Sequence, residues 1–312
     1  MFCLGSVAGS DGVFEINQAC ASGVGCFPGD NPGLPVEITQ TGSYRLTSNL
    51  TVPDENTDGI EVQVDGVSID LGGFAIIGPV TCDNSLNCTP AGSGHGINAG
   101  SAHQTGVSNG SIRGMGSFGL AGGFAAMVSN VRTSGNAVTG IAASVGSIIE
   151  NSTARRNGGQ GIFISNCVVR GCASSSNGGD GIGSSQSTIT QNTVSQNKRI
   201  GISSGSSIIV NNAVILSGTV GISTGSGATV QGNTVGSSGG IGINAFGSTL
   251  VIGNTIADST GYGLRMGSRT AFTQNVLSGN TGGHVVRVVN GATAVDLGHN
   301  SCEAGACVID NP

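Results

Sequence analysis

The sequence is poor in the residues that build ordinary globular cores. It has no tryptophan, 4% aromatic residues and 9% charged residues over 312 positions, whereas an average chain is about 25% charged. No run approaches the ~18 apolar residues of a membrane span, and the first dozen residues lack the basic and long apolar regions of a secretion signal. The net charge of −6 gives no general attraction to nucleic acid. We therefore expect neither a membrane span nor a nucleic-acid partner.

What the chain has instead is glycine, at 57 positions, together with recurrent valine and isoleucine. Disordered chains are usually charged and poor in β-branched residues, so this composition favours a folded β protein. The strongest signal is a repeat of about 21 residues. A glycine followed by Ile or Leu returns at Gly96-Ile97, Gly119-Leu120, Gly140-Ile141, Gly161-Ile162, Gly181-Ile182, Gly201-Ile202, Gly221-Ile222, Gly242-Ile243 and Gly263-Leu264.

Two further columns share this period. The second contains Asn109, Asn130, Asn151, Gly171, Asn192, Asn212, Asn233, Asn254 and Asn275. The third contains Asn136, Asn157, Asn177, Asn197, Ser217, Ser238, Ser259 and Asn280. We interpret all three columns as scaffold: Ile packs inward on its copies, and Asn suits turns because it tolerates left-handed backbone and bonds its stacked neighbours.

Short apolar–polar alternations lie between these markers, and no helix fits between them. The chain must therefore coil so that equivalent strands stack in parallel about 4.8 Å apart. The predicted fold is all-β: a right-handed parallel β-helix of about a dozen turns, with three short strands in each turn. We expect residues 1–41 to form an N-terminal segment and loop, acting as a cap or an inter-subunit contact, and residues 42–312 to form one β-helix domain.

The segments Gly42–Leu50 and Gly59–Gly78 resemble the opening turns of bacterial right-handed β-helix repeat proteins of the pectin-lyase-like superfamily. The resemblance extends from about Gly42 to Asn300. It implies the fold more than the function, because that superfamily includes lyases, hydrolases, epimerases, adhesins and phage spikes. The resemblance implies that an enzyme would work from a groove along one face, with stacked carboxylates or with calcium and a basic residue.

Glycoside hydrolysis needs two carboxylates roughly 5 to 10 Å apart. Between Asn84 and Ala257 the sequence offers only Glu150 and Asp180, more than one turn apart in sequence. We therefore do not expect a hydrolase site in the central turns, and no catalytic residue is assigned.

Eight of the nine cysteines form close pairs, which predicts four local disulfides and an oxidising compartment. The predicted pairs are Cys20 with Cys26, Cys82 with Cys88, Cys167 with Cys172, and Cys302 with Cys307. Burial as small apolar residues is the alternative, above all for Cys167. Cys3 is left over for an intermolecular bond, and the expected location is extracellular or at the cell surface.

The acidic residues concentrate near the start of the chain. Asp54, Asn56, Asp58 and Asp65 have the spacing of a calcium loop, D-x-N-x-D-G-x5-D. A solvated turn is the alternative that we prefer, because strands flank the segment and no helices do. Calcium is the one cofactor that the sequence suggests.

A basic patch is the second candidate site. Arg155 and Arg156 precede one corner asparagine, Lys198 and Arg199 follow another two turns later, and Arg170 can join them. Such a patch would bind an acidic polysaccharide through charge-assisted hydrogen bonds, while solubilising charge is the alternative that we prefer. The four histidines, His95, His103, His284 and His299, show no metal or triad spacing and are expected in turns. Phe118 and Phe124 are expected to pack beneath a glycine-rich loop.

The ends of the solenoid show no amphipathic capping helix, and open ends favour head-to-tail stacking. The leading hypothesis is a non-catalytic extracellular structural or adhesive protein that self-associates through its ends into filaments. The second hypothesis is a lyase, hydrolase or binding module for acidic polysaccharide. An ice- or surface-binding face ranks last, because Ala213 interrupts the threonine column of Thr193, Thr234 and Thr255.

Overall fold

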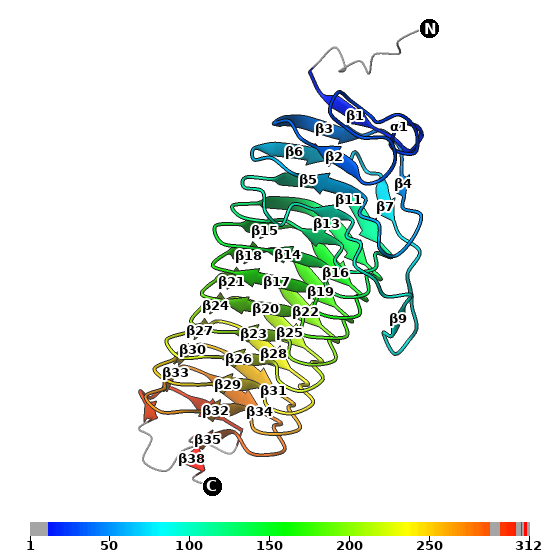
Figure 1. Ribbon diagram of the computed structural model, residues 1–312. Coiled ribbons are helices and arrows are strands. Elements are labelled where there is room, and N and C mark those ends of the chain that lie inside the picture. The colour runs from blue at the N-terminus through cyan, green and yellow to red at the C-terminus, as the bar shows by residue number, and fades with distance from the viewer. Residues whose placement is uncertain (1–11, 288–293, 304–306, 308, 311–312) are drawn as a thin grey trace, which may run out of the picture. The chain divides into compact units, whose positions relative to one another are not determined.

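The computed structural model describes residues 12–287, 294–303, 307 and 309–310. The chain is an all-β parallel β-solenoid of about 12 turns, which confirms the predicted fold class. Its described residues form one helix, α1 (Gln18–Ala21). The chain divides into two compact units, residues 1–163 and residues 164–312, called here the first and second unit (Figure 1).

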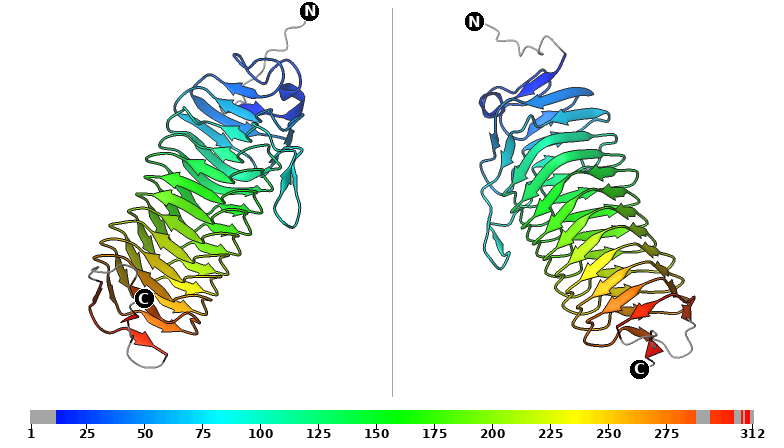
Figure 2. Two further views of the ribbon diagram at one scale, coloured as in Figure 1. Left: turned by 60° about the horizontal axis from the view of Figure 1, so that its bottom comes forward. Right: turned by 180° about the vertical axis from the view of Figure 1, so that it is seen from behind.

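Most turns of the solenoid contribute three short strands, as predicted, one to sheet B and two to sheet A, and the stacking within each unit can be followed in Figure 2. Two turns of the first unit differ, because one eight-residue strand, β11 (Gly106–Arg113) or β13 (Met127–Ser134), takes the place of the two sheet A strands. The domain boundary expected after residue 41 stays a prediction, but parallel pairing already begins before it. Phe14 pairs with Tyr44, and Val36 pairs with Ile60.

In the first unit, sheet B comprises β2 (Val36–Ile38), β5 (Ile60–Val62), β10 (Ile97–Asn98), β12 (Leu120–Ala121) and β14 (Ile141–Ala143). Sheet A comprises β1 (Phe14–Ile16), β3 (Gly42–Leu46), β4 (Leu50–Thr51), β6 (Val67–Asp70), β7 (Ala75–Ile77), β11 (Gly106–Arg113), β13 (Met127–Ser134), β15 (Ile148–Glu150) and β16 (Thr153–Arg155). An antiparallel hairpin, β8 (Thr81–Cys82) with β9 (Cys88–Thr89), projects from this unit (Figure 1). The division between the units falls inside β17 (Ile162–Ser165).

In the second unit, sheet B comprises β20 (Ile182–Ser185), β23 (Ile202–Ser204), β26 (Ile222–Thr224), β29 (Ile243–Ala245), β32 (Leu264–Met266), β35 (Val285–Arg287) and β38 (Ile309–Asp310). Sheet A comprises β18 (Val168–Arg170), β19 (Ala173–Ser175), β21 (Thr188–Thr190), β22 (Thr193–Ser195), β24 (Ile208–Val210), β25 (Ala213–Ile215), β27 (Thr229–Gln231), β28 (Thr234–Gly236), β30 (Leu250–Ile252), β31 (Thr255–Ala257), β33 (Ala271–Thr273), β34 (Val276–Ser278), β36 (Val295–Asp296) and β37 (Ser301–Cys302).

The glycine–aliphatic column forms an interior file in each unit, as predicted. In the first unit the file runs through Ile60, Ile97, Leu120 and Ile141. In the second unit it runs through Ile182, Ile202, Ile222, Ile243, Leu264 and Val285. All of these side chains are fully buried, and each contributes about 1.5–3 kcal/mol of hydrophobic stabilisation.

The glycine before each aliphatic residue is required by close packing at the corner. A Cβ added at Gly201 would lie 2.3 Å from Val214 Cγ1 and 2.6 Å from the carbonyl oxygen of Gly221. Any side chain at this position would therefore push adjacent turns apart.

The second sequence column contains left-handed corners and stacked amides, as expected for scaffold, but its members do not form one file. Its first members, such as Asn130 and Asn151, are exposed corner residues in the left-handed region, with φ of 55° and 49°. Its later members, such as Asn212, Asn233 and Asn254, are buried and follow a left-handed corner residue at the preceding position. The marker advances 21 residues from Gly171 to Asn192, whereas the left-handed corner advances 20 residues from Gly171 to Gln191. A corner column in the sequence therefore continues as an interior one.

The interior Asn residues of the second unit form a continuous ladder. Asn233 accepts hydrogen bonds at Oδ1 from both the backbone N–H (2.9 Å) and Nδ2 (3.0 Å) of Asn212. Its own Nδ2 donates to the carbonyl oxygen of Ile209 (2.9 Å) and to Oδ1 of Asn254 (3.0 Å). The buried amides are thereby paired, which is the condition for placing polar groups inside a core.

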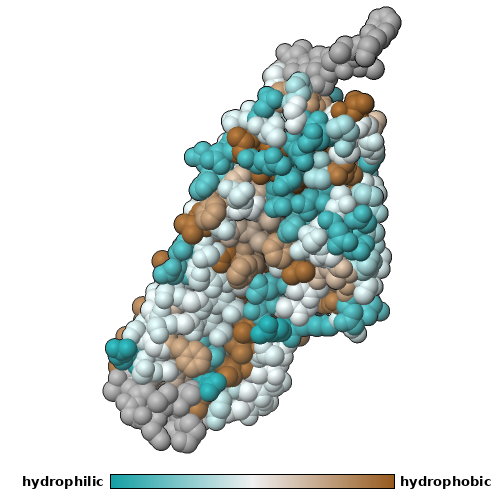
Figure 3. All heavy atoms as spheres, viewed as in Figure 1, coloured by the Kyte–Doolittle hydropathy of each residue, from teal (hydrophilic) through white to brown (hydrophobic). Residues whose placement is uncertain are grey.

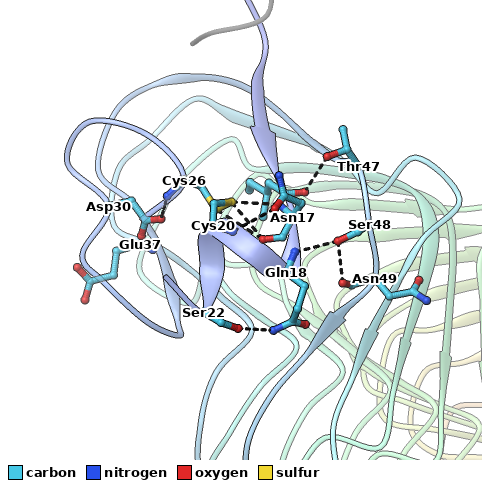
Figure 4. Close-up of a disulfide and its surroundings, with 11 residues drawn as sticks. Asn17, Gln18, Cys20, Ser22, Cys26, Asp30, Glu37, Thr47, Ser48 and Asn49 are labelled. Carbon is cyan, nitrogen blue, oxygen red and sulfur yellow. Dashed lines mark hydrogen bonds between the residues drawn. A yellow bond between two sulfur atoms is a disulfide. The ribbon is translucent and has the colours of Figure 1, made fainter. Parts of the chain in front are cut away.

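A disulfide-closed segment covers the N-terminal end of the first unit, where we expected either a cap or an inter-subunit contact. Asn17 caps α1, and Cys20 forms a disulfide with Cys26 (Figure 4). Phe27 is 6% exposed and packs its ring 5.4 Å from Phe14. A short helix is sufficient here because the disulfide and the aromatic side chains hold the segment against the first turn.

Three of the four expected disulfides are present: Cys20–Cys26, Cys82–Cys88 and Cys302–Cys307. The expected bridge between Cys167 and Cys172 is not formed, so that prediction was wrong. These two buried residues flank strand β18, and a strand rises about 3.3 Å per residue, which keeps their Cα atoms beyond the ~7 Å limit for a disulfide. The Cys167 and Cys172 thiols instead donate to the carbonyl oxygens of Ser165 and Arg170. Cys3, expected to form an intermolecular bond, lies outside the described residues.

Candidate functional site

The first turns of sheet B bring an aspartate and a histidine together at one corner. The sequence reads Asp58-Gly-Ile-Glu61 in one turn and His95-Gly-Ile-Asn98 in the next, and Ile60 pairs with Ile97. The shared spacing therefore stacks His95 on Asp58 and Asn98 on Glu61. His95 Nδ1 lies 3.2 Å from Asp58 Oδ1, so the expectation that no histidine meets an acid was wrong.

Asp58 is the centre of a small polar network. Its Oδ1 also accepts the backbone N–H of His95 (2.6 Å), and its Oδ2 accepts Nδ2 of Asn98 (2.9 Å). Burial raises the pKa of Asp58, but the hydrogen bonds from His95 and Asn98 and the charge of the imidazole outweigh it, so its pKa lies below the usual value. Asp58 is therefore an ionised carboxylate that fixes the position of its neighbours.

This network lies in a hollow on the outside of the first unit. The hollow encloses about 360 Å³ and is lined by Leu34, Pro35, Asn56, Thr57, Asp58, Ser93, His95 and Asn98. The side chains of Asp58 and His95 are 17% and 22% exposed, so both can be reached by a ligand. The ring of Phe118 packs edge-on against His95 at 5.2 Å and supports it. This contact differs from the burial beneath a loop that we expected for Phe118.

A column of outward-facing residues runs along sheet B beside the hollow. Glu37 pairs with Glu61, Glu61 with Asn98, Asn98 with Ala121, and Ala121 with Ala142. The next strand continues in the same register. The N–H of Leu120 donates to the carbonyl oxygen of Gly140, and the N–H of Ile141 donates in the same way to that of Gly161. Phe163 therefore lies beside Ala142, as Ala142 lies beside Ala121. We call Glu37, Glu61, Asn98, Ala121, Ala142 and Phe163 the sheet B column.

The two glutamates of this column differ in their surroundings. The Glu37 carboxylate accepts a hydrogen bond from Nδ2 of Asn31, and Figure 4 shows Glu37 beside Asp30 at the edge of the N-terminal loop. The Glu61 carboxylate has no hydrogen-bond partner among the described residues and is half-exposed. Neighbouring parallel strands lie about 4.8 Å apart, so the two carboxyl groups are neighbours on one face.

The residues expected to bind calcium are not gathered around one point. Asp54 Oδ1 accepts hydrogen bonds from the backbone of Asn56 and the hydroxyl of Thr57, which lower the pKa of Asp54. Asp58 is held by His95, and Asp65 Oδ1 accepts the backbone N–H of His103. Within the described residues no three His, Cys, Asp or Glu side chains are placed to hold a metal ion. Calcium binding at Asp54, Asn56, Asp58 and Asp65 stays a prediction without support from this geometry.

The basic residues of the expected patch are divided between the two units. In the first unit Arg155 ends β16, and Arg156 donates from Nη2 to the carbonyl oxygen of Asp83 in the projecting hairpin (3.4 Å). In the second unit Arg199 Nε lies 3.8 Å from Asp180 Oδ1, and Lys198 precedes it at the same corner. Arg170 pairs with Thr190 at the end of another strand. Arg170 therefore does not belong to the corner of Lys198 and Arg199.

Sequence reasoning missed Glu37, Asn98 and His95 as site residues. The glycine–aliphatic column could have indicated these residues. The residue before each glycine forms one file, which contains Asp58 and His95, and the residue after each aliphatic forms another, which contains Glu61 and Asn98. Asp58 was singled out only as a calcium ligand. The 37-residue interval between Ile60 and Ile97 hid their alignment.

The chain has a right-handed parallel β-helix fold, as predicted. A sequence model of the family described as periplasmic copper-binding protein (NosD) matches residues 183–293, part of the second unit. A search of curated proteins finds no relative. None of the described residues forms a helix with the length and apolar character needed to span a bilayer.

Solved structures similar to this chain include three carbohydrate-related proteins. The periplasmic alginate epimerase AlgG is 12% identical, with 86% of this chain and 76% of that chain covered and a TM-score of 0.52. The mannuronan C-5 epimerase AlgE6 A-module from Azotobacter vinelandii is 13% identical, with 93% and 88% covered and a TM-score of 0.52. The catalytic domain of a GH87 alpha-1,3-glucanase, in complex with tetrasaccharides, is 11% identical, with 85% and 62% covered and a TM-score of 0.63. At these identities the likeness concerns the fold.

Proposed function

We propose that this protein binds a polysaccharide along the outer face of sheet B in the first unit, at the hollow around Asp58 and His95. The single observation that carries the proposal is the stack of Glu37, Glu61 and Asn98 beside a hydrogen-bonded Asp–His pair in an open hollow. Carboxylate and amide side chains aligned on neighbouring strands can form hydrogen bonds with the several hydroxyl groups that every sugar presents. The fold neighbours named above act on or bind polysaccharides, which supports a carbohydrate ligand in general terms.

The reaction that fits this site is glycoside hydrolysis. Glu61, which has no partner among the described residues, can turn to the glycosidic oxygen and donate a proton as that bond breaks. Glu37 on the adjacent strand, about 5 Å away, bonds to the anomeric carbon as the glycosidic bond breaks. Water, deprotonated by the Glu61 carboxylate, then hydrolyses this glycosyl intermediate and releases Glu37. Asp58 acts through His95 and Asn98, which it holds in place, and is a positioning residue.

The location that we propose is outside the cytoplasm, in the periplasm or beyond the cell. Three disulfides are typical of an oxidising compartment. The partial match to a family described as periplasmic supports the same compartment.

The test is a binding and turnover assay on purified protein with a panel of polysaccharides. Glu61→Gln should abolish release of reducing ends and leave binding within about threefold of the wild type. The matched control is Glu15→Gln, which removes one exposed negative charge from β1 in sheet A of the same unit and should change neither property. Hydrolysis that is equal in Glu61→Gln and the wild type would exclude Glu61 as the acid, and absence of binding to every polysaccharide would overturn the proposal.

Copper is the ligand in the description of the partly matching family, but the matched residues do not fit it. Copper sites use His, Cys and Met donors, and residues 183–293 contain one histidine, one methionine and no cysteine. Met266 ends β32, whereas His284 precedes β35, which pairs with the start of β32. The two donors therefore lie at opposite ends of neighbouring strands, and we assign no copper chemistry to the chain.

End-to-end assembly into an adhesive or structural filament, our leading hypothesis from the sequence, is the second candidate. Open solenoid ends were one argument for assembly, and this argument is weakened because the segment from Asn17 to Phe27 covers the N-terminal end. Sedimentation velocity over a hundredfold range of concentration checks it: a filament former gives growing species, and a single slow boundary excludes assembly.

A further inference from the structure

The basic residues of the first unit are confined to one of its two sheets. Its five basic residues all lie in sheet A or directly after it: Arg45, Arg113, Arg132, Arg155 and Arg156. The outer face of sheet B has Glu37 and Glu61 in register, with Asp58 at the adjoining corner. Arg45 is engaged by Asp70, also in sheet A, at 3.7 Å. A ligand on the sheet B column therefore meets carboxylates and no arginine or lysine of that unit.

The spacing of the sheet B column allows its carboxylates to discriminate against a glycan that has one carboxylate on each sugar. Successive strands place one side chain about every 4.8 Å, which is close to the length of one sugar residue in an extended chain. A polyuronate carries one carboxylate per sugar, so a polyuronate lying on the column would oppose like charges at Glu37 and again at Glu61. Repulsion between charges held a few ångströms apart works against a wrong partner and sets specificity.

The far end of the column is apolar and shallow. Beyond Asn98 come two alanines, Ala121 and Ala142, and then Phe163, whose side chain is 49% exposed. An exposed aromatic ring at the end of a shelf of small side chains offers an apolar face on which the C–H face of a sugar ring can stack. Such stacking needs no charge on the sugar.

We infer that the ligand of this site is a glycan chain without carboxylate or sulfate groups, held by Glu37, Glu61 and Asn98 at one end and by Phe163 at the other. This inference rests on the proposed function and reverses the acidic polysaccharide expected from the sequence. Two classes of glycan lack carboxylate and sulfate groups: neutral glycans and glycans with free amino groups. The two differ in that only amino groups gain from the charge of the glutamates.

Affinity electrophoresis and calorimetry with four probes test the inference: an α-1,3-glucan oligosaccharide, a chitosan oligosaccharide, oligogalacturonate and oligomannuronate. At least one of the first two should bind tenfold or more tightly than either uronate. Binding of the glucan should not change between 20 and 300 mM salt, whereas binding of chitosan should weaken, which separates the two sources.

Variants then locate the selectivity. Glu37→Gln with Glu61→Gln should raise affinity for the uronates at least fivefold, because it removes the repulsion and keeps the shape. Phe163→Ala should weaken the preferred glycan about fivefold to tenfold. The matched control, Glu15→Gln with Glu150→Gln, removes two negative charges from strands β1 and β15 of sheet A in the same unit and should leave the preference unchanged. Circular dichroism of each variant establishes that it is folded.

The outcomes separate the two proposals. Tight binding of the uronates alone would overturn the inference and keep the carbohydrate function. A preference for uncharged or amino glycans that survives the Glu37 and Glu61 replacements would overturn the assignment to this face. Absence of binding to all four probes would overturn the inference and count against the proposed function together.

Discussion

The two units are built on one repeat but differ in charge. Residues 1–163 contain 12 of the 17 acidic residues and 5 of the 11 basic residues, whereas residues 164–312 contain 5 and 6. From Ile200 to Ala257 the sequence has no Asp, Glu, Lys, Arg or His at all. Figure 3 shows the corresponding surfaces, with hydrophilic side chains gathered over the N-terminal strands and pale, near-neutral residues over the later ones.

They also differ in regularity. In the second unit the interior file from Ile182 to Val285 advances by 20 or 21 residues per turn. In the first unit the step from Ile60 to Ile97 is 37 residues, and the additional length forms the β8–β9 hairpin and the loop that brings His95 to Asp58. The comparison teaches that the regular repeat is scaffold and that the proposed site lies where the repeat is interrupted.

The largest effect should come from the Asn ladder of the second unit. Asn233→Ala leaves the buried backbone N–H of Asn212 without its acceptor. It also removes three further ladder bonds, one each from Nδ2 of Asn212, the carbonyl oxygen of Ile209 and Oδ1 of Asn254. We expect a loss of about 3–4 kcal/mol in the free energy of unfolding, since each unsatisfied buried group costs about 1–3 kcal/mol. Urea titration followed by circular dichroism measures it.

Ser238→Ala is the matched control in the same unit. The buried Ser238 hydroxyl has no hydrogen-bond partner among the residues that the structure describes. Its removal should therefore change stability by less than about 0.5 kcal/mol or increase it. Equal losses in the two variants would show that the ladder has no special role.

The next effect concerns the disulfides of the first unit. Cys20→Ser with Cys26→Ser should cost about 2 kcal/mol, because a short closed loop then gains freedom in the unfolded chain and the cover over the first turn loosens. Cys82→Ser with Cys88→Ser opens a loop of the same spacing in a projecting hairpin. We expect less than about 1 kcal/mol there, and thermal unfolding of both variants compares them.

The polar network at the site predicts a pH-dependent difference. Asp58→Asn should lower stability by about 2 kcal/mol at pH 7, since charge-assisted hydrogen bonds contribute about 1.5–3 kcal/mol each. Because the pKa of Asp58 lies below its usual value in the folded state, its contribution is present above roughly pH 4 and is lost as the pH falls through the folded pKa. The melting temperatures of wild type and variant should therefore converge as the pH falls below the usual pKa of an aspartate, and a gap that stays constant through acid titration would contradict the assignment.

The smallest effect should appear in binding, and it contrasts the two units directly. Asn98→Ala should weaken glycan binding about tenfold, or about 1.4 kcal/mol. Ser203→Ala changes the outward residue of sheet B strand β23 in the second unit and should leave binding unchanged. Calorimetry with the preferred glycan decides between a site in the first unit and a ligand spread over both.

The fold was predictable because its signal is periodic and local. The glycine–aliphatic column defined the interior file residue by residue, and three of the four close cysteine pairs form disulfides. The second column misled us because a drift of one residue in turn length converts exposed corners such as Asn151 into interior positions such as Asn212 without breaking the sequence pattern. Cysteine spacing along the chain could not show that Cys167 and Cys172 flank a strand.

The site was only partly predictable, for a related reason. Asp58 stood out by its place in an acidic run, but its partner His95 lies 37 positions further on, beyond an irregular hairpin. Pairing across such an insertion depends on the register of Ile60 with Ile97, which the average period does not provide. Charge selectivity also depended on knowing which sheet each arginine joins.

The regular register of the second unit means that its turns are equivalent to one another. Ile182, Ile202 and Ile222 lie on successive strands at 20-residue steps, so removal of residues 201–220 would join Ile200 to Gly221 with every stacked side chain matched to an equivalent one. A deletion of one residue within a strand would instead turn inward-facing side chains outward. Length in such a chain can therefore change by whole turns, through duplication or loss, without redesign of what remains.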